Sequence, residues 1–203
     1  MKRHTFFPFL LLISTVIPAL RGQNDGRNGQ TFSKIDLAVQ AIREAYSIRT
    51  GTETAADDAD IQPINLDLGG KDIPEVFRHL VSQRRAYSWV LENGVYDLYP
   101  AANGQGLSEI TVHAFILKDA SRLDASQELS KLPELQKWLS DHHASRKEII
   151  NESTYRNKDQ RVSLSLSDMP LRTVLNELIG SFGDTQWAIS HYGDRMQYVA
   201  IYF

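Results

Sequence analysis

Hydrophobic and polar residues alternate in two short stretches that lie 98 residues apart. In residues 64–68 and again in residues 162–166, every second residue is Ile, Leu or Val, and the residues between them are Asn, Asp or Ser. A period of two is typical of a β-strand that buries one face. The pattern therefore predicts one strand in each stretch.

A helix is predicted after each of these strands. Apolar residues recur at spacings of three and four in residues 73–81 and 171–179, which gives each segment one apolar face. Asp72 and Asp168 stand at the expected N-caps, and a proline follows each within two residues, where its missing N–H costs nothing. We expect the second helix to end at Gly183.

A β-hairpin is predicted after each helix. Residues 87–91 and 185–189 each contain a tryptophan among strand-forming residues, and further strands are expected at 95–99 and 196–202. The turns are Asn93-Gly94 in the first hairpin and Tyr192-Gly193-Asp194 in the second, and Asn-Gly between two such runs is a strong hairpin signal.

The two regions match at a constant offset of 98 residues without a gap. The matched apolar pairs are Leu66 and Leu164, Leu68 and Leu166, Ile73 and Leu171, Val76 and Val174, Leu80 and Leu178, Val81 and Ile179, and Trp89 and Trp187. This regularity predicts an internal duplication. A unit of about 40 residues has too little core to fold alone, so we expect the copies to pack on each other or on the segment between them.

The predicted fold class is α+β, with two related strand-helix-strand-strand copies and an intervening helical segment. Residues 33–101 form the first copy, which begins with a helix capped by Ser33 and Asp36 and stopped before Gly51. Residues 102–160 form a connection with a strand, helices, one of which starts at Pro133, and a polar loop. Residues 161–203 form the second copy. A partial third copy within residues 110–143 is an alternative for the connection.

The first 22 residues are typical of a signal peptide. Lys2 and Arg3 precede an uncharged run of 15 residues, Phe6 to Leu20, which contains two prolines. This run is shorter than the roughly 20 residues that span a bilayer, which disfavours the alternative of an uncleaved anchor. Cleavage can follow Ala19 or Gly22. We expect an exported protein, periplasmic or secreted, with a flexible leader over residues 23–32 and no stable membrane insertion after cleavage.

Charge and cysteine content limit the classes of partner and the covalent modifications that we expect for this chain. Removal of residues 1–22 takes away three basic residues and no acid, which moves the formal net charge from −3 to −6. An acidic surface disfavours nucleic acid and anionic membranes as partners. The chain has no cysteine, which excludes disulfides and a lipid-modified cysteine.

The sequence predicts no catalytic residue, no metal ligand and no cofactor. The glycines at 69 and 70 and at 104 and 106 do not complete a phosphate-binding or dinucleotide motif, and the histidines lack metal-ligand spacing. One basic cluster remains, Arg78, Arg84 and Arg85, as a possible contact for a ligand or an acidic partner. Attraction of arginines to the negative end of a helix is the alternative explanation.

The stretch Val162-Ser-Leu-Ser-Leu-Ser-Asp-Met-Pro-Leu-Arg-Thr-Val-Leu175, followed by an aromatic strand and a hairpin, resembles the secretin and TonB short N-terminal domain family. The resemblance covers about 80 residues in two pieces. It implies a periplasmic interaction module with no catalytic residue in this region. Those domains are attached to a secretin or a TonB-dependent barrel, and nothing in this sequence encodes either, so the partner stays unnamed.

These observations predict a non-enzymatic, exported protein-interaction module of the cell envelope, with an envelope protein as its partner. The alternative is a periplasmic protein that binds a small ligand or a glycan in a cleft between the two copies.

Overall fold

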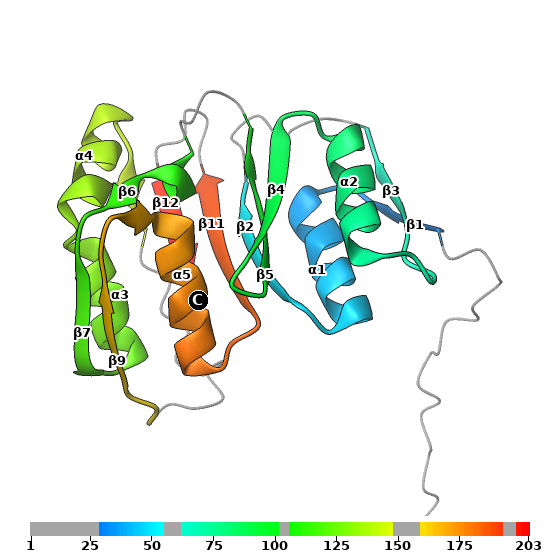
Figure 1. Ribbon diagram of the computed structural model, residues 1–203. Helices are drawn as coiled ribbons and strands as arrows, with labels where there is room; N and C mark the ends of the chain where they lie inside the picture. The colour runs from blue at the N-terminus through cyan, green and yellow to red at the C-terminus, as the bar shows by residue number, and fades with distance from the viewer. Residues whose placement is uncertain (1–28, 55–61, 102–105, 148–158, 193–197) are drawn as a thin grey trace, which may run out of the picture.

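The computed structural model describes residues 29–54, 62–101, 106–147, 159–192 and 198–203 (Figure 1). The predicted signal peptide and the second predicted turn, at Gly193 and Asp194, lie outside these residues. Five α-helices and a mixed six-stranded sheet give an α+β fold within the described part of the chain.

The six-stranded sheet runs through both halves of the chain. Its strands in spatial order are β4 (Tyr87–Glu92), β5 (Val95–Pro100), β2 (Arg49–Glu53), β11 (Gln186–Tyr192), β12 (Tyr198–Tyr202) and β8 (Ser145–Arg146). β2 and β11 are parallel, and they form the one strand pairing between the halves among the described residues.

Helices of the first half lie on one side of this sheet, and those of the second half lie on the other (Figure 1). The first half adds β1 (Gly29–Phe32), α1 (Ile35–Tyr46), β3 (Ile64–Asp67) and α2 (Ile73–Gln83). The second half adds η1 (Leu107–Glu109), β6 (Thr111–Val112), β7 (Phe115–Ala120), α3 (Arg122–Ser130), α4 (Pro133–Asp141), β9 (Val162–Leu166), β10 (Met169–Pro170) and α5 (Leu171–Phe182).

Strand pairings in the second half follow the same order as those in the first. β1 pairs antiparallel with β3, as β7 does with β9; β4 pairs antiparallel with β5, as β11 does with β12; and β5 pairs parallel with β2, as β12 does with β8. This correspondence agrees with the duplication expected from the sequence, which itself stays a prediction. The middle segment supplies β7, α3, α4 and β8 to the second half.

Side-chain alternation explains the two separate cores. Tyr96 and Leu98 on β5 point toward α1 and α2 and pack with the first core. Val95 on the same strand points the other way, into the core that α5 forms with Trp187 and Ile189 of β11. The sheet therefore divides the two cores.

Most predicted elements are confirmed. α2 and α5 cover the two periodic segments, and α5 ends at Gly183 with φ 71°, a conformation that glycine adopts readily. Asn93 and Gly94 have φ 52° and 76°, as a type I′ hairpin turn requires. α4 begins at Pro133, as expected.

Several predicted boundaries are wrong. The flexible leader was expected through residue 32, but Gly29–Phe32 forms β1, because β3 offers a ladder partner. Helix α1 ends at Tyr46 with Ser47 in the left-handed conformation, and it has Lys34 at its N-cap, so Ser33 makes no capping box with Asp36.

The caps at the two aspartates also differ from expectation. Asp72 is the N-cap of α2 but makes no side-chain cap bond. Asp168 lies outside α5, whose N-cap is Pro170, since Met169 and Pro170 pair with β6 instead. A complete capping box occurs in α3, between Ser121 and Asp124.

Candidate functional site

Strand β4 is the outermost strand of the six-stranded sheet in the described part of the chain. It pairs with β5 alone among the described strands, in continuous register over six residues. With a two-residue turn at 93–94, antiparallel alternation directs the backbone N–H and C=O of Trp89 and Leu91 away from β5. These groups, flanked by the half-exposed Leu91 side chain, can accept another strand.

Two other edges carry features that discourage strand addition, whereas β4 has a single charged residue, Glu92, at its end. The opposite edge, β8, is only two residues long. β7 carries Lys118 and Asp119 and an irregular register between Leu117 and Ala120. Short length, charge and irregularity all hinder edge pairing, and Tyr87–Glu92 has neither a lysine nor a proline.

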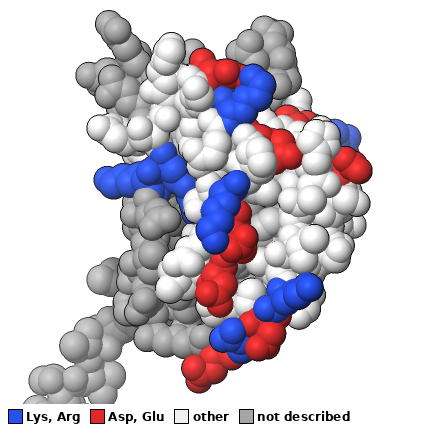
Figure 2. Space-filling model, turned by 90° about the vertical axis from the view of Figure 1, so that its left-hand side faces the viewer, with Lys and Arg blue, Asp and Glu red and all other residues white. Residues whose placement is uncertain are grey.

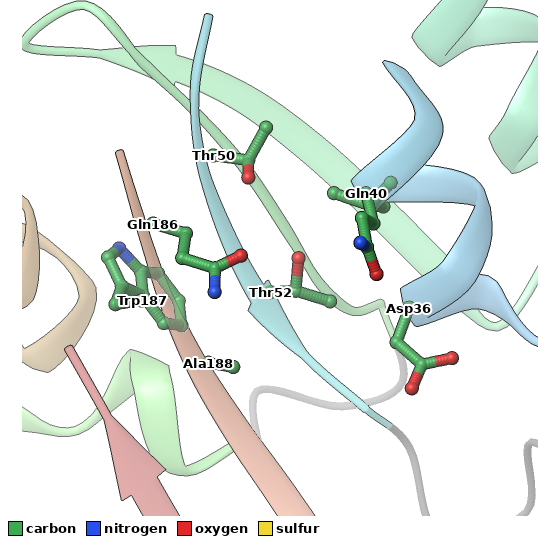
Figure 3. Close-up of a pocket in the computed structure, with 8 residues that line it drawn as sticks. Asp36, Gln40, Thr50, Thr52, Gln186, Trp187 and Ala188 are labelled. Atoms are coloured by element: carbon green, nitrogen blue, oxygen red, sulfur yellow. The ribbon is translucent and has the colours of Figure 1, made fainter. Parts of the chain in front are cut away.

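A small pocket lies where the two halves meet. α1 forms one wall, and neighbouring residues of β2 and β11 form the floor (Figure 3). Its volume is about 120 Å³. The lining residues are Asp36, Val39, Gln40, Thr50, Thr52, Gln186, Trp187 and Ala188. Because α1 and β2 belong to the first half and β11 to the second, neither half contains this pocket alone.

Two largely buried threonines face this pocket. Thr50 and Thr52 are 2% and 6% exposed, and their side chains lie between β2 and α1 in Figure 3. Neither hydroxyl makes a hydrogen bond to any described residue. Parallel pairing of β2 with β11 puts Gln186 beside Thr50 and Ala188 beside Thr52 on the same sheet face.

Tyrosines continue this sheet face beyond the pocket. Tyr202 on β12 is the cross-strand partner of Ala188, and its hydroxyl lies 3.0 Å from that of Tyr192. Burial raises the pKa of Tyr202, as does its contact with Tyr192. The two rings bracket Ala200, which is 1% exposed.

A chain of buried polar groups lies on the opposite face of the same strands. Trp187 Nε1 donates to Asn176 Oδ1 at 2.6 Å, and Asn176 Nδ2 donates to Asp97 Oδ2 at 2.7 Å. Burial raises the pKa of Asp97 to about 8, with a smaller contribution from Glu92, although the bond from Asn176 lowers it. Asp97 is therefore largely protonated at neutral pH.

The close approach of these groups depends on Gly51. A Cβ atom at this position would overlap both the Trp187 indole and the Asp97 carboxyl group. Gly51 was expected to stop a helix, but it lies within β2 and makes room for the tryptophan. This role could not be found from the helix pattern of residues 33–46.

Charged side chains join β4 and η1 to α5 beside this chain. Arg172 Nε lies 3.3 Å from Glu92 Oε2, and Arg172 also pairs with Glu109. Thr173 Oγ1 donates to Glu92 Oε1 at 2.9 Å. These contacts fix α5 against strands of the first half.

A second buried contact, between Glu53 and His191, also joins the halves. His191 Nε2 lies 2.9 Å from Glu53 Oε1, and the backbone N–H groups of Leu107 and Ser108 donate to the two carboxylate oxygens at 2.7 and 2.9 Å. Gly106 passes so close that a Cβ there would lie 2.9 Å from Glu53 Oε2. With both oxygens occupied, this carboxylate anchors the start of η1.

The three arginines of the predicted contact cluster do not act alike. Arg84 is 3% exposed and bonds through its guanidinium group to the Gln62 carbonyl oxygen, so it lies in the interior. At the 98-residue offset it corresponds to Phe182, which is also buried. Arg78 and Arg85 are exposed, and Arg78 Nε donates to the Pro74 carbonyl oxygen at 3.2 Å. The predicted basic surface is therefore reduced to two arginines.

Figure 2 shows the outer face formed by the second half, where acidic and basic side chains lie beside one another. Lys137 pairs with Asp141 at 2.6 Å, and Arg161 pairs with Asp119 at 3.0 Å. Interspersed ion pairs of this kind leave no large area of one sign on this face.

The described residues contain neither a metal-binding group of side chains nor a membrane-spanning helix. No group of three or more His, Asp or Glu side chains there could hold a metal ion. None of the helices in this part of the chain is both long enough and apolar enough to cross a bilayer.

His113 and Asp168 form an exposed pair, with His113 Nδ1 2.9 Å from Asp168 Oδ1, and this hydrogen bond raises the pKa of His113.

Comparison with protein-family models, with curated proteins and with solved structures found no match to this chain. The resemblance to secretin and TonB short N-terminal domains thus stays a prediction from the sequence.

Proposed function

We propose that this chain is a non-enzymatic protein-interaction module of the cell envelope, and that it binds its partner by adding a strand to the free edge of β4. The observation that carries the proposal is this edge. It offers outward backbone groups at Trp89 and Leu91 along a strand with regular register. Main-chain hydrogen bonds supply affinity in such complexes, while alternate side chains supply specificity.

Support also comes from the rigid backing of the edge. The Trp89 ring packs against the tilted ring of Phe77 and stacks with that of Tyr96, with ring centroids 5.5 and 6.1 Å apart, so α2 and β5 hold β4 in place. A preordered strand loses less conformational freedom when a partner binds. The N-terminal pattern of the chain supports export, and the family resemblance supports an envelope partner.

Affinity capture from an envelope extract of the source organism tests this proposal. The unmodified protein and two variants, Leu91→Pro and Leu91→Thr, serve as bait. Proline at this position removes the outward N–H without removing a bond to β5. Threonine changes the side chain but keeps the amide and favours a strand.

We expect the unmodified protein and Leu91→Thr to recover the same envelope protein, and Leu91→Pro to lose it. Urea unfolding of both variants checks that the fold is retained. Equal recovery with Leu91→Pro would refute binding at this edge, and the absence of any reproducible partner would argue against an interaction module.

A further inference from the structure

The pocket between α1 and the β2–β11 strands has the features of a binding site that is separate from the β4 edge. Its floor contains two threonines that are more than nine-tenths buried as residues, and their hydroxyls make no hydrogen bond to another described residue but stay open to the pocket. Hydroxyl groups at the floor of a pocket are normally hydrogen-bonded to water or to a ligand. Hydroxyl groups of a ligand can replace water at these positions.

The lining chemistry selects against charged ligands. Among the described residues that line the pocket, Asp36 alone carries a formal charge, and none is a lysine or an arginine. An anion would therefore meet a carboxylate without a compensating cation. Asp36 also offers little to a cation, because it is exposed and its Oδ1 already accepts the Leu37 N–H at 2.8 Å.

The remaining groups suit a neutral ligand that is rich in hydroxyls. Threonine hydroxyls both donate and accept, and the amides of Gln40 and Gln186 supply further donors and acceptors. In Figure 3 the amide of Gln186 extends over the floor toward Thr52, and Gln40 and Asp36 project from α1. These groups surround the space from both sides.

The size of the pocket and a nearby aromatic residue narrow the class of ligand. A cavity of about 150 Å³ can hold a six-membered ring, so a solvent-open pocket of about 120 Å³ fits one ring with part of it outside. Tyr202 is the cross-strand partner of the lining residue Ala188, so it puts an aromatic residue on the same sheet face, although it does not line the pocket itself. Aromatic rings offer flat apolar surface, on which the less polar face of a sugar ring can stack.

We propose that this pocket binds one neutral sugar ring, with Thr50, Thr52 and Gln186 as its hydrogen-bonding groups. The site needs both halves of the chain, so only the assembled six-stranded sheet can hold it. It does not depend on strand addition at β4, and variants at the two places can be tested independently.

Amide chemical-shift titration of the purified, isotope-labelled protein tests the proposal. The sugar probes are methyl glucoside, methyl galactoside, methyl mannoside and N-acetylglucosamine at millimolar concentrations. Methylguanidinium and inorganic phosphate represent cationic and anionic ligands. We expect at least one sugar, and neither ion, to shift the amide signals of residues 50–52 and 186–188 in a saturable way.

Variants identify the groups that bind. Thr50→Val with Thr52→Val keeps the side-chain shape and β-branching but removes both hydroxyls, and it should weaken the sugar at least about tenfold. Thr111→Val, on an exposed position of β6, is the matched control and should leave the affinity unchanged. If the double variant fails to fold, Gln186→Ala gives the same test at an exposed residue.

The proposal is overturned if no sugar shifts these amides, or if only methylguanidinium or phosphate does. It is also overturned if sugar affinity survives both the double threonine variant and Gln186→Ala.

Discussion

The first half of the chain, residues 29–101, and the second half, residues 106–203, share their strand pairings but differ in what they bury. Trp89 and Trp187 occupy equivalent positions at the 98-residue offset, yet Trp89 is half-buried in an aromatic cluster and Trp187 is 1% exposed. Arg78 on α2 is exposed, while its equivalent on α5, Asn176, is 2% exposed and bonds to Trp187. The two halves thus have the same strand pairings but different interiors.

This difference follows from the position of each helix. α2 packs at the outer end of the sheet, where its far side meets solvent. α5 packs over β11 and β2 at the junction of the halves, so more of its surface is covered. The polar chain from Trp187 to Asp97 is present only where one half packs on the other.

Alanine at Leu80 or at Leu178 should produce the largest change. Both side chains are fully buried, one in each core, so each substitution should lower the free energy of unfolding by about 2–5 kcal/mol. Urea denaturation measures this, with Leu37→Ala, at 44% exposure, as the control. A loss below about 1 kcal/mol at one of the two leucines would show that the halves do not share this core position.

Phenylalanine at Trp187 and at Trp89 should distinguish the two equivalent tryptophans. Trp187→Phe leaves Asn176 Oδ1 without its donor in the interior, so we expect a loss of about 1–3 kcal/mol in addition to the change in packing. Trp89→Phe removes no hydrogen bond between described groups and keeps an aromatic ring, so its effect should be smaller. Equal losses in urea denaturation would contradict the asymmetry described above.

Stability should depend on pH through Asp97. Its pKa is near 8 in the folded protein and near 3.8 in the unfolded chain, so the folded state holds a proton that the unfolded chain has lost between these values. The free energy of unfolding should therefore fall as pH rises from about 4 to about 8, by at most about 1.4 kcal/mol per pH unit from this group.

Asp97→Asn isolates this contribution, since asparagine keeps the shape without titrating. The difference in unfolding free energy between the variant and the unmodified protein should move in favour of the variant as pH rises through this range. A difference that stays constant with pH would show that Asp97 is ionised in the folded protein.

Alanine at Arg84 and Arg85 should give the smallest but still distinct pair of effects. Arg84 is buried at a position equivalent to Phe182, so its removal should cost about 1 kcal/mol or more. Arg85 is exposed, and its removal should change stability by less than about 0.5 kcal/mol. Thermal unfolding of the two variants makes the comparison, and equal midpoints would place both arginines at the surface.

Periodicity alone predicted most of the elements, because the strands and helices each bury one face in a regular pattern. It failed where the backbone pairs with distant residues, as at β1 and at Met169–Pro170. Periodicity also could not identify Thr50, Gly51 or Thr52 as part of the junction between the halves. The segment 49–53 is short and polar, and it lacks alternating apolar residues. The sequence did hold a signal for the unusual role of Asp97, because it is the one acidic residue in the strand predicted at residues 95–99.

The parallel pairing of β2 with β11 also sets the order in which the molecule can fold. Glu53 and His191, which meet at this junction, are 138 residues apart in the chain. Contacts of such long range require the ends of a large loop to meet before any stabilisation is gained, which slows folding. During synthesis from the N-terminus, β2 is made early and can pair with β5. The edge of β2 that pairs with β11 in the folded protein then stays unpaired until nearly the whole chain is complete. Over that interval a strand from another chain can take the place of β11, so the joining strand is also the point at which this protein is most exposed to misassembly.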